Sequence, residues 1–305
     1  MGKLLHDQFP EAKSVFEEAN QILDWDIRDR IFNGSEDQLK QTNVTQPAIF
    51  TVSCAAFRVF SSRLPSTSVQ IVSAAGHSLG EYSALFAAQV FDFKTGLKLV
   101  EYRGQFIQEA CRKNPGSMAA MIGFERDQLQ KLCSESQEGG EVCEMVNFNC
   151  PGQIVVAGSK KGIEALAAKA ASVPGTKTVL LNVSGAFHSS LMKEAAGWMK
   201  GSLEKTALKD AWVPVFTNCD AKPTSSGAEI KEKLVRQIDH PVLWEDSIQA
   251  MAAQGVETFV EIGPGKVLTG LLRKIDRKIK VLNVEDPDSL AKTLQGLETA
   301  EVKTS

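Results

Sequence analysis

Long apolar runs are absent from this chain of 305 residues. No stretch approaches the roughly 20 apolar residues that a membrane-spanning helix needs. A strong excess of charge is missing too, since the formal net charge is -3, which argues against a nucleic-acid binder that relies on bulk positive charge. The start, Met1-Gly2-Lys3-Leu4-Leu5-His6-Asp7, predicts neither a signal peptide nor an Arg-rich transit peptide. We therefore expect a cytoplasmic protein that contacts neither membrane nor nucleic acid.

Metal-binding patterns are also missing. The six cysteines form no C-x-x-C pair, and the four histidines do not cluster with them. We expect reduced thiols, no metal and no resident cofactor. Because hydrophobic residues make up 43% and charged residues 23% of the chain, the composition is that of an ordinary globular protein, with room for one large domain or two smaller ones.

The most informative pattern that is present is G-x-S-x-G at Gly76-His77-Ser78-Leu79-Gly80. The run 69–72 predicts a buried strand before it, and residues 81–88 predict a helix after it. A serine at such a turn is a nucleophile elbow, and a side chain at either glycine should crowd the turn. The free N–H groups of the helix start favour a developing oxyanion. The alternative is a glycine-rich turn with a serine that caps the helix.

The rest of the chain predicts two interleaved α/β units. Residues 112–185 read as strand, helix, two strands, helix and strand, which is the βαββαβ order of a ferredoxin-like unit. Apolar strands at 212–218 and 258–262 alternate with helical sequence and predict a parallel sheet. We expect a large α/β-hydrolase-like domain, formed by residues 1–111 and 186–305, with the small domain 112–185 inserted into it.

A serine nucleophile needs a base, and the chain offers four histidines. His6 lies near the terminus, His77 should point away from Ser78, and His240 precedes a proline in a turn. His188, where the chain re-enters the large domain, is the best of the four. The alternative is a histidine at a helix start with a satisfied ring.

A hydrolase would also place an acid between Ser78 and His188. Asp92 and Asp127 lie in that interval, but neither follows a convincing strand. This gap weakens the case for a plain α/β-hydrolase.

Several further motifs occur in one order along the chain. With the elbow, the segments are 45–48 (TQPA), 76–85 (GHSLGEYSAL), 102–104 (YRG), 146–153 (VNFNCPGQ), 185–189 (GAFHS), 235–237 (VRQ) and 261–268 (EIGPGKVL). Together they closely resemble the malonyl-CoA:acyl-carrier-protein transacylases of fatty-acid synthesis, which have a large α/β domain with a ferredoxin-like insert.

This resemblance implies a role for each matched residue. Ser78 is similar to the acylated nucleophile and His188 to its base, held by the backbone carbonyl of Gln237 rather than by an acid. The Leu79 N–H resembles one oxyanion donor. Arg103 resembles the arginine that pairs with the free carboxylate of malonate, which a guanidinium can bind through two hydrogen bonds. The alternative for Arg103 is an ion pair on a helix surface.

The remaining implied contacts concern selectivity and partners. Phe187 resembles the malonyl-selecting version of its motif, and Gln46 and Asn147 resemble further substrate-binding residues. The resemblance implies malonyl-CoA as substrate, the phosphopantetheine of acyl carrier protein as acceptor, and a monomer. We expect five exposed basic residues to steer an acidic carrier protein: Lys266, Arg273, Lys274, Arg277 and Lys278. The alternative is an ordinary solvated helix face.

One departure from the family is large. Members normally open with a short strand that ends in G-Q-G-S-Q, whose first Gln supplies a second oxyanion donor. Met1-Gly2-Lys3 aligns just past that loop, and G-Q-G-S-Q occurs nowhere in the chain. We therefore expect one central strand and half of the oxyanion hole to be missing, which typically lowers turnover by about 10²–10³. The alternatives to the transacylase are a serine acyltransferase or hydrolase of other selectivity, and a weakly active scaffold.

Overall fold

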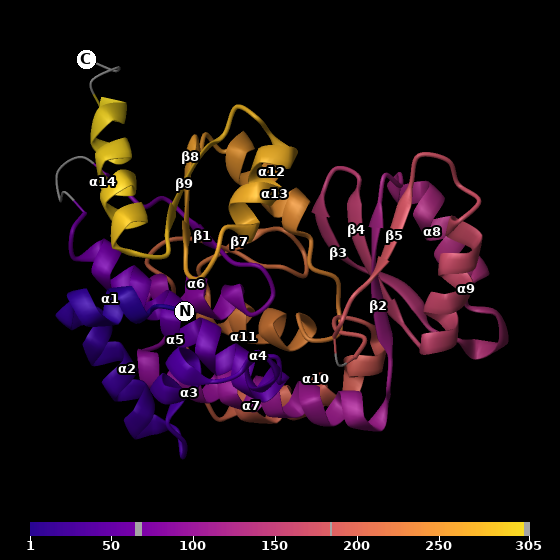
Figure 1. Ribbon diagram of the computed structural model, residues 1–305, viewed down its shortest axis with the longest axis horizontal. Coiled ribbons are helices and arrows are strands. Elements are labelled where there is room, and N and C mark those ends of the chain that lie inside the picture. The colour runs from indigo at the N-terminus through magenta and orange to yellow at the C-terminus, as the bar shows by residue number, and fades with distance from the viewer. Residues whose placement is uncertain (65–68, 184, 302–305) are drawn as a thin grey trace.

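The computed structural model describes residues 1–64, 69–183 and 185–301. Helices gather at the N-terminal side of the molecule (Figure 1). They are α1 (Lys3–Gln8), α2 (Pro10–Ile22), α3 (Ile27–Asn33), α4 (Glu36–Leu39) and α5 (Thr42–Ser61). The helix α5 begins at Thr42, so Pro47 lies inside it. A proline this near the first turn removes few helical hydrogen bonds.

In place of the single parallel sheet expected from 212–218 and 258–262, the structure has two separate pieces. In one, β1 (Ala74–Ala75) pairs in parallel with β6 (Val215–Phe216), and β6 pairs with the antiparallel β7 (Pro223–Thr224). In the other, β8 (Thr258–Ile262) pairs in parallel with β9 (Lys280–Val284). The strand expected at 69–72 is wrong, since only Ala74–Ala75 forms ladder pairs at this edge. Backbone becomes a strand only where a neighbour accepts and donates its hydrogen bonds.

A cavity of about 590 Å³ is lined by residues of both pieces, 69–76 and 258–264. Helices cover the two pieces and complete the large domain. They are α6 (Gly80–Ala87), α7 (Phe93–Lys113), η2 (Ser190–Met192), α10 (Lys193–Glu204), α11 (Gly227–Arg236), α12 (Trp244–Ala253), α13 (Val267–Ile275) and α14 (Pro287–Glu301). One buried apolar cluster joins α2, α5, α6, α7, α10 and α11. None of the described helices is both long and apolar enough to cross a membrane.

A separate four-stranded sheet lies to one side of these two pieces (Figure 1). Its strands are β2 (Ser117–Ile122), β3 (Cys143–Cys150), β4 (Gln153–Gly158) and β5 (Lys177–Leu180), in the spatial order β3-β4-β2-β5 with antiparallel neighbours throughout. Helices α8 (Arg126–Glu135) and α9 (Lys160–Ala170) pack on one face, and the turn η1 (Glu138–Gly140) precedes β3. The observed order of elements is the predicted βαββαβ. The boundary expected at residue 112 falls inside the last turn of α7.

Side chains of β2 alternate between two apolar layers, as the period of a strand dictates. Ala119 and Met121 face α8 and α9, whereas Met118 and Ala120 face a smaller cluster that contains Ala186. Phe187 and Leu191 pack against that second cluster. The small sheet therefore supports the segment that carries His188.

Candidate active site

The elbow lies between β1 and α6, as the motif predicts. Ser78 has φ 51°, a left-handed conformation that residues other than glycine rarely adopt. A Cβ on Gly76 would lie 2.0 Å from the carbonyl oxygen of Gly80, so only glycine fits there. At Gly80 the expectation of crowding is wrong, because a Cβ there would meet no atom within 4 Å.

His188 lies against the Ser78 hydroxyl. Its Nε2 is 2.7 Å from Ser78 Oγ, and its Nδ1 is 2.7 Å from the backbone oxygen of Gln237. Because a carbonyl oxygen only accepts, Nδ1 carries the proton and Nε2 is left to accept the serine proton. Burial, together with the positive charge of Arg103, lowers the pKa of His188 to about 3. The imidazole is therefore neutral at physiological pH.

No carboxylate takes the place of the Gln237 carbonyl. Asp92, one of the two acids weighed from the sequence, instead caps α7 by accepting the N–H of Thr95 at 2.8 Å. Asp127 lies in the first turn of α8 in the small domain. None of the other three histidines contacts Ser78 through its ring. The rings of His6 and His240 are hydrogen-bonded to the neighbouring carboxylates of Asp7 and Asp239. His77 Nε2 is 2.8 Å from Asn149 Oδ1.

Arg103 reaches the nucleophile from α7. Its side chain is only 2% exposed, and Nη2 donates to Ser78 Oγ at 3.1 Å and to Gln237 Oε1 at 3.0 Å. Nη1 donates to Gln46 Oε1 at 2.5 Å. Within the described residues Arg103 forms no ion pair with a carboxylate, and its Nε has no hydrogen-bond partner. The alternative of a surface ion pair is therefore wrong.

A buried guanidinium without a direct ion-pair partner is costly, because the charge of nearby Glu81 offsets its desolvation only in part. Burial accordingly lowers the pKa of Arg103, although a guanidinium stays charged in proteins. Its planar fork suits a carboxylate. The site thus holds a nucleophile, a neutral base and an unpaired cation within one hydrogen-bonded cluster.

Leu79 follows the nucleophile directly and is the N-cap residue of α6. Across the part of the chain that the structure describes, the Leu79 N–H has no hydrogen-bond acceptor, whereas the next three N–H groups donate back to His77, Ser78 and Leu79. A free N–H at a helix start beside Ser78 can donate to a developing oxyanion.

Phe187 and Asn147 lie nearby without joining the cluster by a hydrogen bond. Phe187 is half-buried next to His188. Asn147 lies at an irregular step of β3, where the backbone pairs with Val242. Its Oδ1 is buried and has no partner among the described residues.

The sequence analysis did not identify two residues that contact the site, Asn218 and Glu81. Asn218 lies two positions after β6 and contacts the elbow, and Glu81 of α6 contacts Asn218 and Gln237. Asn218 could have been found from the rule that sites of open α/β sheets gather at the carboxyl ends of parallel strands. Glu81 lies beside the motif, but nothing in the sequence shows which way it points.

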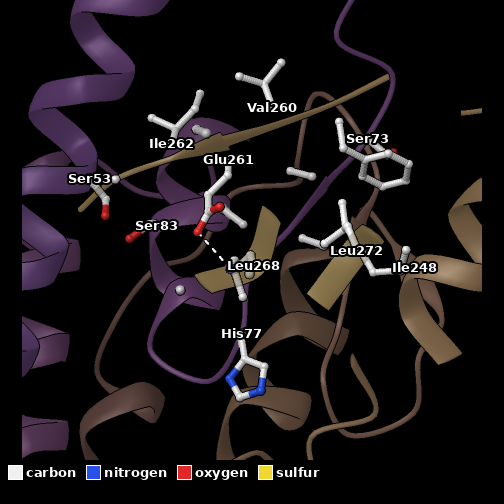
Figure 2. Close-up of a pocket in the computed structure, with 18 of the residues that line it drawn as sticks. Ser53, Ser73, His77, Ser83, Ile248, Val260, Glu261, Ile262, Leu268 and Leu272 are labelled. Carbon is white, nitrogen blue, oxygen red and sulfur yellow. Dashed lines mark hydrogen bonds between the residues drawn. The ribbon is translucent and has the colours of Figure 1, made fainter. Parts of the chain in front are cut away.

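Figure 2 shows the cavity behind the elbow, with His77 at one end and Ser53, Ser73 and Ser83 along its wall. Glu261 of β8 accepts the N–H of Leu268 at 3.0 Å across it (Figure 2). The ring of His77 packs edge-on against Trp244, and burial lowers the pKa of His77. Ser78, Arg103 and His188 are not among the lining residues, but Leu79 and the other elbow residues Gly76, His77 and Gly80 are, so the cavity adjoins the catalytic cluster at the elbow.

Comparisons with known proteins agree with this geometry. The family model described as an acyl transferase domain matches residues 1–296. The malonyl CoA-acyl carrier protein transacylase of Bacillus subtilis (strain 168) is 43% identical over 97% of this chain and 92% of its own length, and that of Escherichia coli (strain K12) is 40% identical over 94% and 92%.

Two solved structures are similar over almost the whole chain. The acyl-carrier-protein S-malonyltransferase of Bartonella henselae has a TM-score of 0.93 at 39% identity, covering 98% of this chain and 95% of that one. A malonyl-transacylase in complex with a type II PKS acyl-carrier protein has a TM-score of 0.92 at 37% identity, covering 97% and 94%.

Proposed function

This chain belongs to the acyl transferase domain family, and we propose that it transfers a malonyl group from malonyl-CoA to the pantetheine thiol of an acyl carrier protein for fatty-acid synthesis. The observation that carries the choice of acyl group is Arg103, a buried guanidinium without a carboxylate partner, 3.1 Å from the Ser78 hydroxyl. A malonyl group brings one negative charge to this place, and an acetyl group brings none.

The first half-reaction makes a malonyl ester on Ser78. His188 Nε2 takes the hydroxyl proton while Ser78 Oγ attacks the thioester carbonyl. The Leu79 N–H and the N-terminal end of α6 stabilise the oxyanion. The C–S bond then breaks, and the imidazolium returns the proton to the sulfur, so that CoA leaves as a thiol.

The second half-reaction reverses these roles. His188 takes the proton of the pantetheine thiol, the sulfur attacks the ester carbonyl, and the proton returns to Ser78 Oγ as the ester bond breaks. Arg103 holds the malonyl carboxylate in both halves. Gln46, Asn147 and Phe187 complete the acyl pocket, with Gln46 orienting the guanidinium through its hydrogen bond to Nη1.

The architecture supports the same proposal. The strand order β3-β4-β2-β5 matches that of a ferredoxin-like domain, and we place that domain as an insert that follows α7 within an α/β-hydrolase-like domain. The chain acts as a monomer in the cytoplasm, where its six buried cysteines stay free thiols. The exposed basic residues suited to an acidic carrier protein are Lys266, Arg273, Lys274, Arg277 and Lys278, although Lys266 also pairs with Glu285.

Transfer itself gives the first test. Incubation with malonyl-CoA and the pantetheine-bearing carrier protein should yield malonyl-carrier protein, detected by intact mass, and CoA in equal amount. The carrier protein without its pantetheine should remain unmodified, because it offers no thiol. Release of CoA and free malonate at a rate that does not depend on the carrier would instead identify a hydrolase.

The state of His188 gives a second test. In ¹⁵N-labelled protein, the His188 ring should stay neutral with its proton on Nδ1 from pH 8 to about pH 4, whereas a histidine in an unfolded chain titrates near pH 6.5. A His188→Gln variant assigns the signal. Below about pH 6.5 the unfolded chain binds this proton, whereas the folded chain excludes it down to about pH 3. The free energy of unfolding should therefore decrease as the pH falls from about 6.5 to about 3. A ring that titrates near 6.5 in the folded protein would contradict the assignment.

A further inference from the structure

We propose that Asn218 and Glu81 are positioning residues that hold Ser78 in its reactive conformation and, through Gln237, fix His188 and Arg103 around it. The proposal rests on Ser78 as the acyl acceptor. Neither side chain belongs to the nucleophile, the base or the guanidinium, and both are buried beneath them.

Asn218 holds the elbow on both sides of His77. Its Oδ1 accepts the Ser78 N–H at 2.7 Å, and its Nδ2 donates to the carbonyl of Gly76 at 2.7 Å. The side chain is 1% exposed, so water does not compete for these bonds. A positive φ on a residue such as Ser78 costs about 1–3 kcal/mol and persists only where the surroundings impose it. Asn218 supplies that restraint from the turn that follows strand β6.

Glu81 holds Asn218 and Gln237 in turn. Its Oε2 accepts the backbone N–H of Asn218 at 3.0 Å and the Nε2 of Gln237 at 2.9 Å. The side chain is fully buried, and burial raises the pKa of Glu81 to about 7. The carboxyl group thus accepts hydrogen bonds from two groups, and its charge interacts with that of Arg103 without a direct ion pair among the described residues.

Gln237 connects Glu81 and Asn218 to the reacting groups. Its Nε2 donates to the Ser78 carbonyl at 2.8 Å, its Oε1 accepts from Arg103, and its backbone oxygen fixes His188. Because one residue touches the nucleophile, the base and the guanidinium, a shift of Gln237 would move all three relative to each other. Errors of about 1 Å in such geometry can cost about 10²-fold in rate.

The test is a single-turnover measurement of Ser78 malonylation that separates rate from amplitude. Asn218→Ala should slow the acylation rate constant by about 10–100-fold, while every folded chain is still malonylated in the end. The KM for malonyl-CoA should change by less than about threefold, because Asn218 does not contact the acyl group. A merely structural role would reduce the amplitude, the fraction of competent chains, and leave the rate of the remainder unchanged.

Matched variants complete the test. Glu81→Ala should slow acylation as Asn218→Ala does, and Glu81→Gln should restore most of the rate, because the amide oxygen can accept the same two hydrogen bonds. Glu101→Gln, at a largely buried glutamate of α7 that pairs with Lys98, should match the wild type. If Asn218→Ala does not fold, Asn218→Asp keeps the volume and the acceptor for the Ser78 N–H but sets an oxygen against the Gly76 carbonyl, so it should also be slow.

The outcomes are distinguishable. Full rate and full amplitude in Asn218→Ala, or a loss of amplitude alone, would overturn the positioning role and leave the proposed function intact. A wild-type chain that forms no malonyl adduct would overturn the proposed function and this role together.

Discussion

Replacing Arg103 by alanine should lower the rate of malonyl transfer at least about 30-fold more than the rate of acetyl transfer. Truncating one partner of a buried, hydrogen-bonded charge pair costs about 2–5 kcal/mol, and every 1.4 kcal/mol is about tenfold. Both substrates should lose some rate, because Arg103 also donates to Ser78 Oγ and Gln237 Oε1. The loss of the charge pair, however, falls on the malonyl group alone.

The measurement is kcat/KM for malonyl-CoA and acetyl-CoA on the same preparations. Arg103→Lys keeps the charge but not the planar fork, so it should lie between the wild type and the alanine variant. Arg126→Ala is the matched control, since Arg126 pairs with Glu245 and Asp246 at the small domain and does not touch the cluster. Equal losses for the two acyl groups would remove Arg103 from acyl selection.

Much of the cluster was predictable because its residues lie within motifs. The elbow follows from G-x-S-x-G with a helix after it, and His188 from the elimination of three other histidines. The resemblance assigned the Gln237 carbonyl, and the structure places it 2.7 Å from His188 Nδ1. The alternation of strands and helices in 112–185 could also be predicted from the sequence, because turn and helical sequence separates its short apolar strands.

Other features depend on contacts that one sequence does not encode locally. The two-residue length of β1 reflects which edges find partners, not the β-branched residues at 69–72. The open space at Gly80 depends on what surrounds it in the fold. Asn218 and Glu81 are 137 residues apart, and their hydrogen bond exists only once β6 lies beside β1. The expected absence of a second oxyanion donor stays a prediction.

Replacing Ser78 by alanine should remove transferase activity altogether, a loss on the order of 10⁵–10⁶ by comparison with other serine nucleophiles. No other group in the cluster can form the acyl intermediate, because His188 and Arg103 serve as base and cation. Ser83 provides the matched control. It lies within α6, five residues after Ser78, and its hydroxyl has no partner among the described residues. Ser83→Ala should therefore keep wild-type activity.

The most direct test of the central claim is the intact mass of the folded chain after brief incubation with malonyl-CoA in the absence of a carrier protein. We predict one malonyl group per chain, located on Ser78 by peptide mapping, retained in Ser83→Ala and absent from Ser78→Ala. Addition of the pantetheine-bearing carrier should then discharge it. A folded wild-type chain without an adduct would indicate a scaffold, and an adduct that persists in Ser78→Ala would place the acyl acceptor elsewhere.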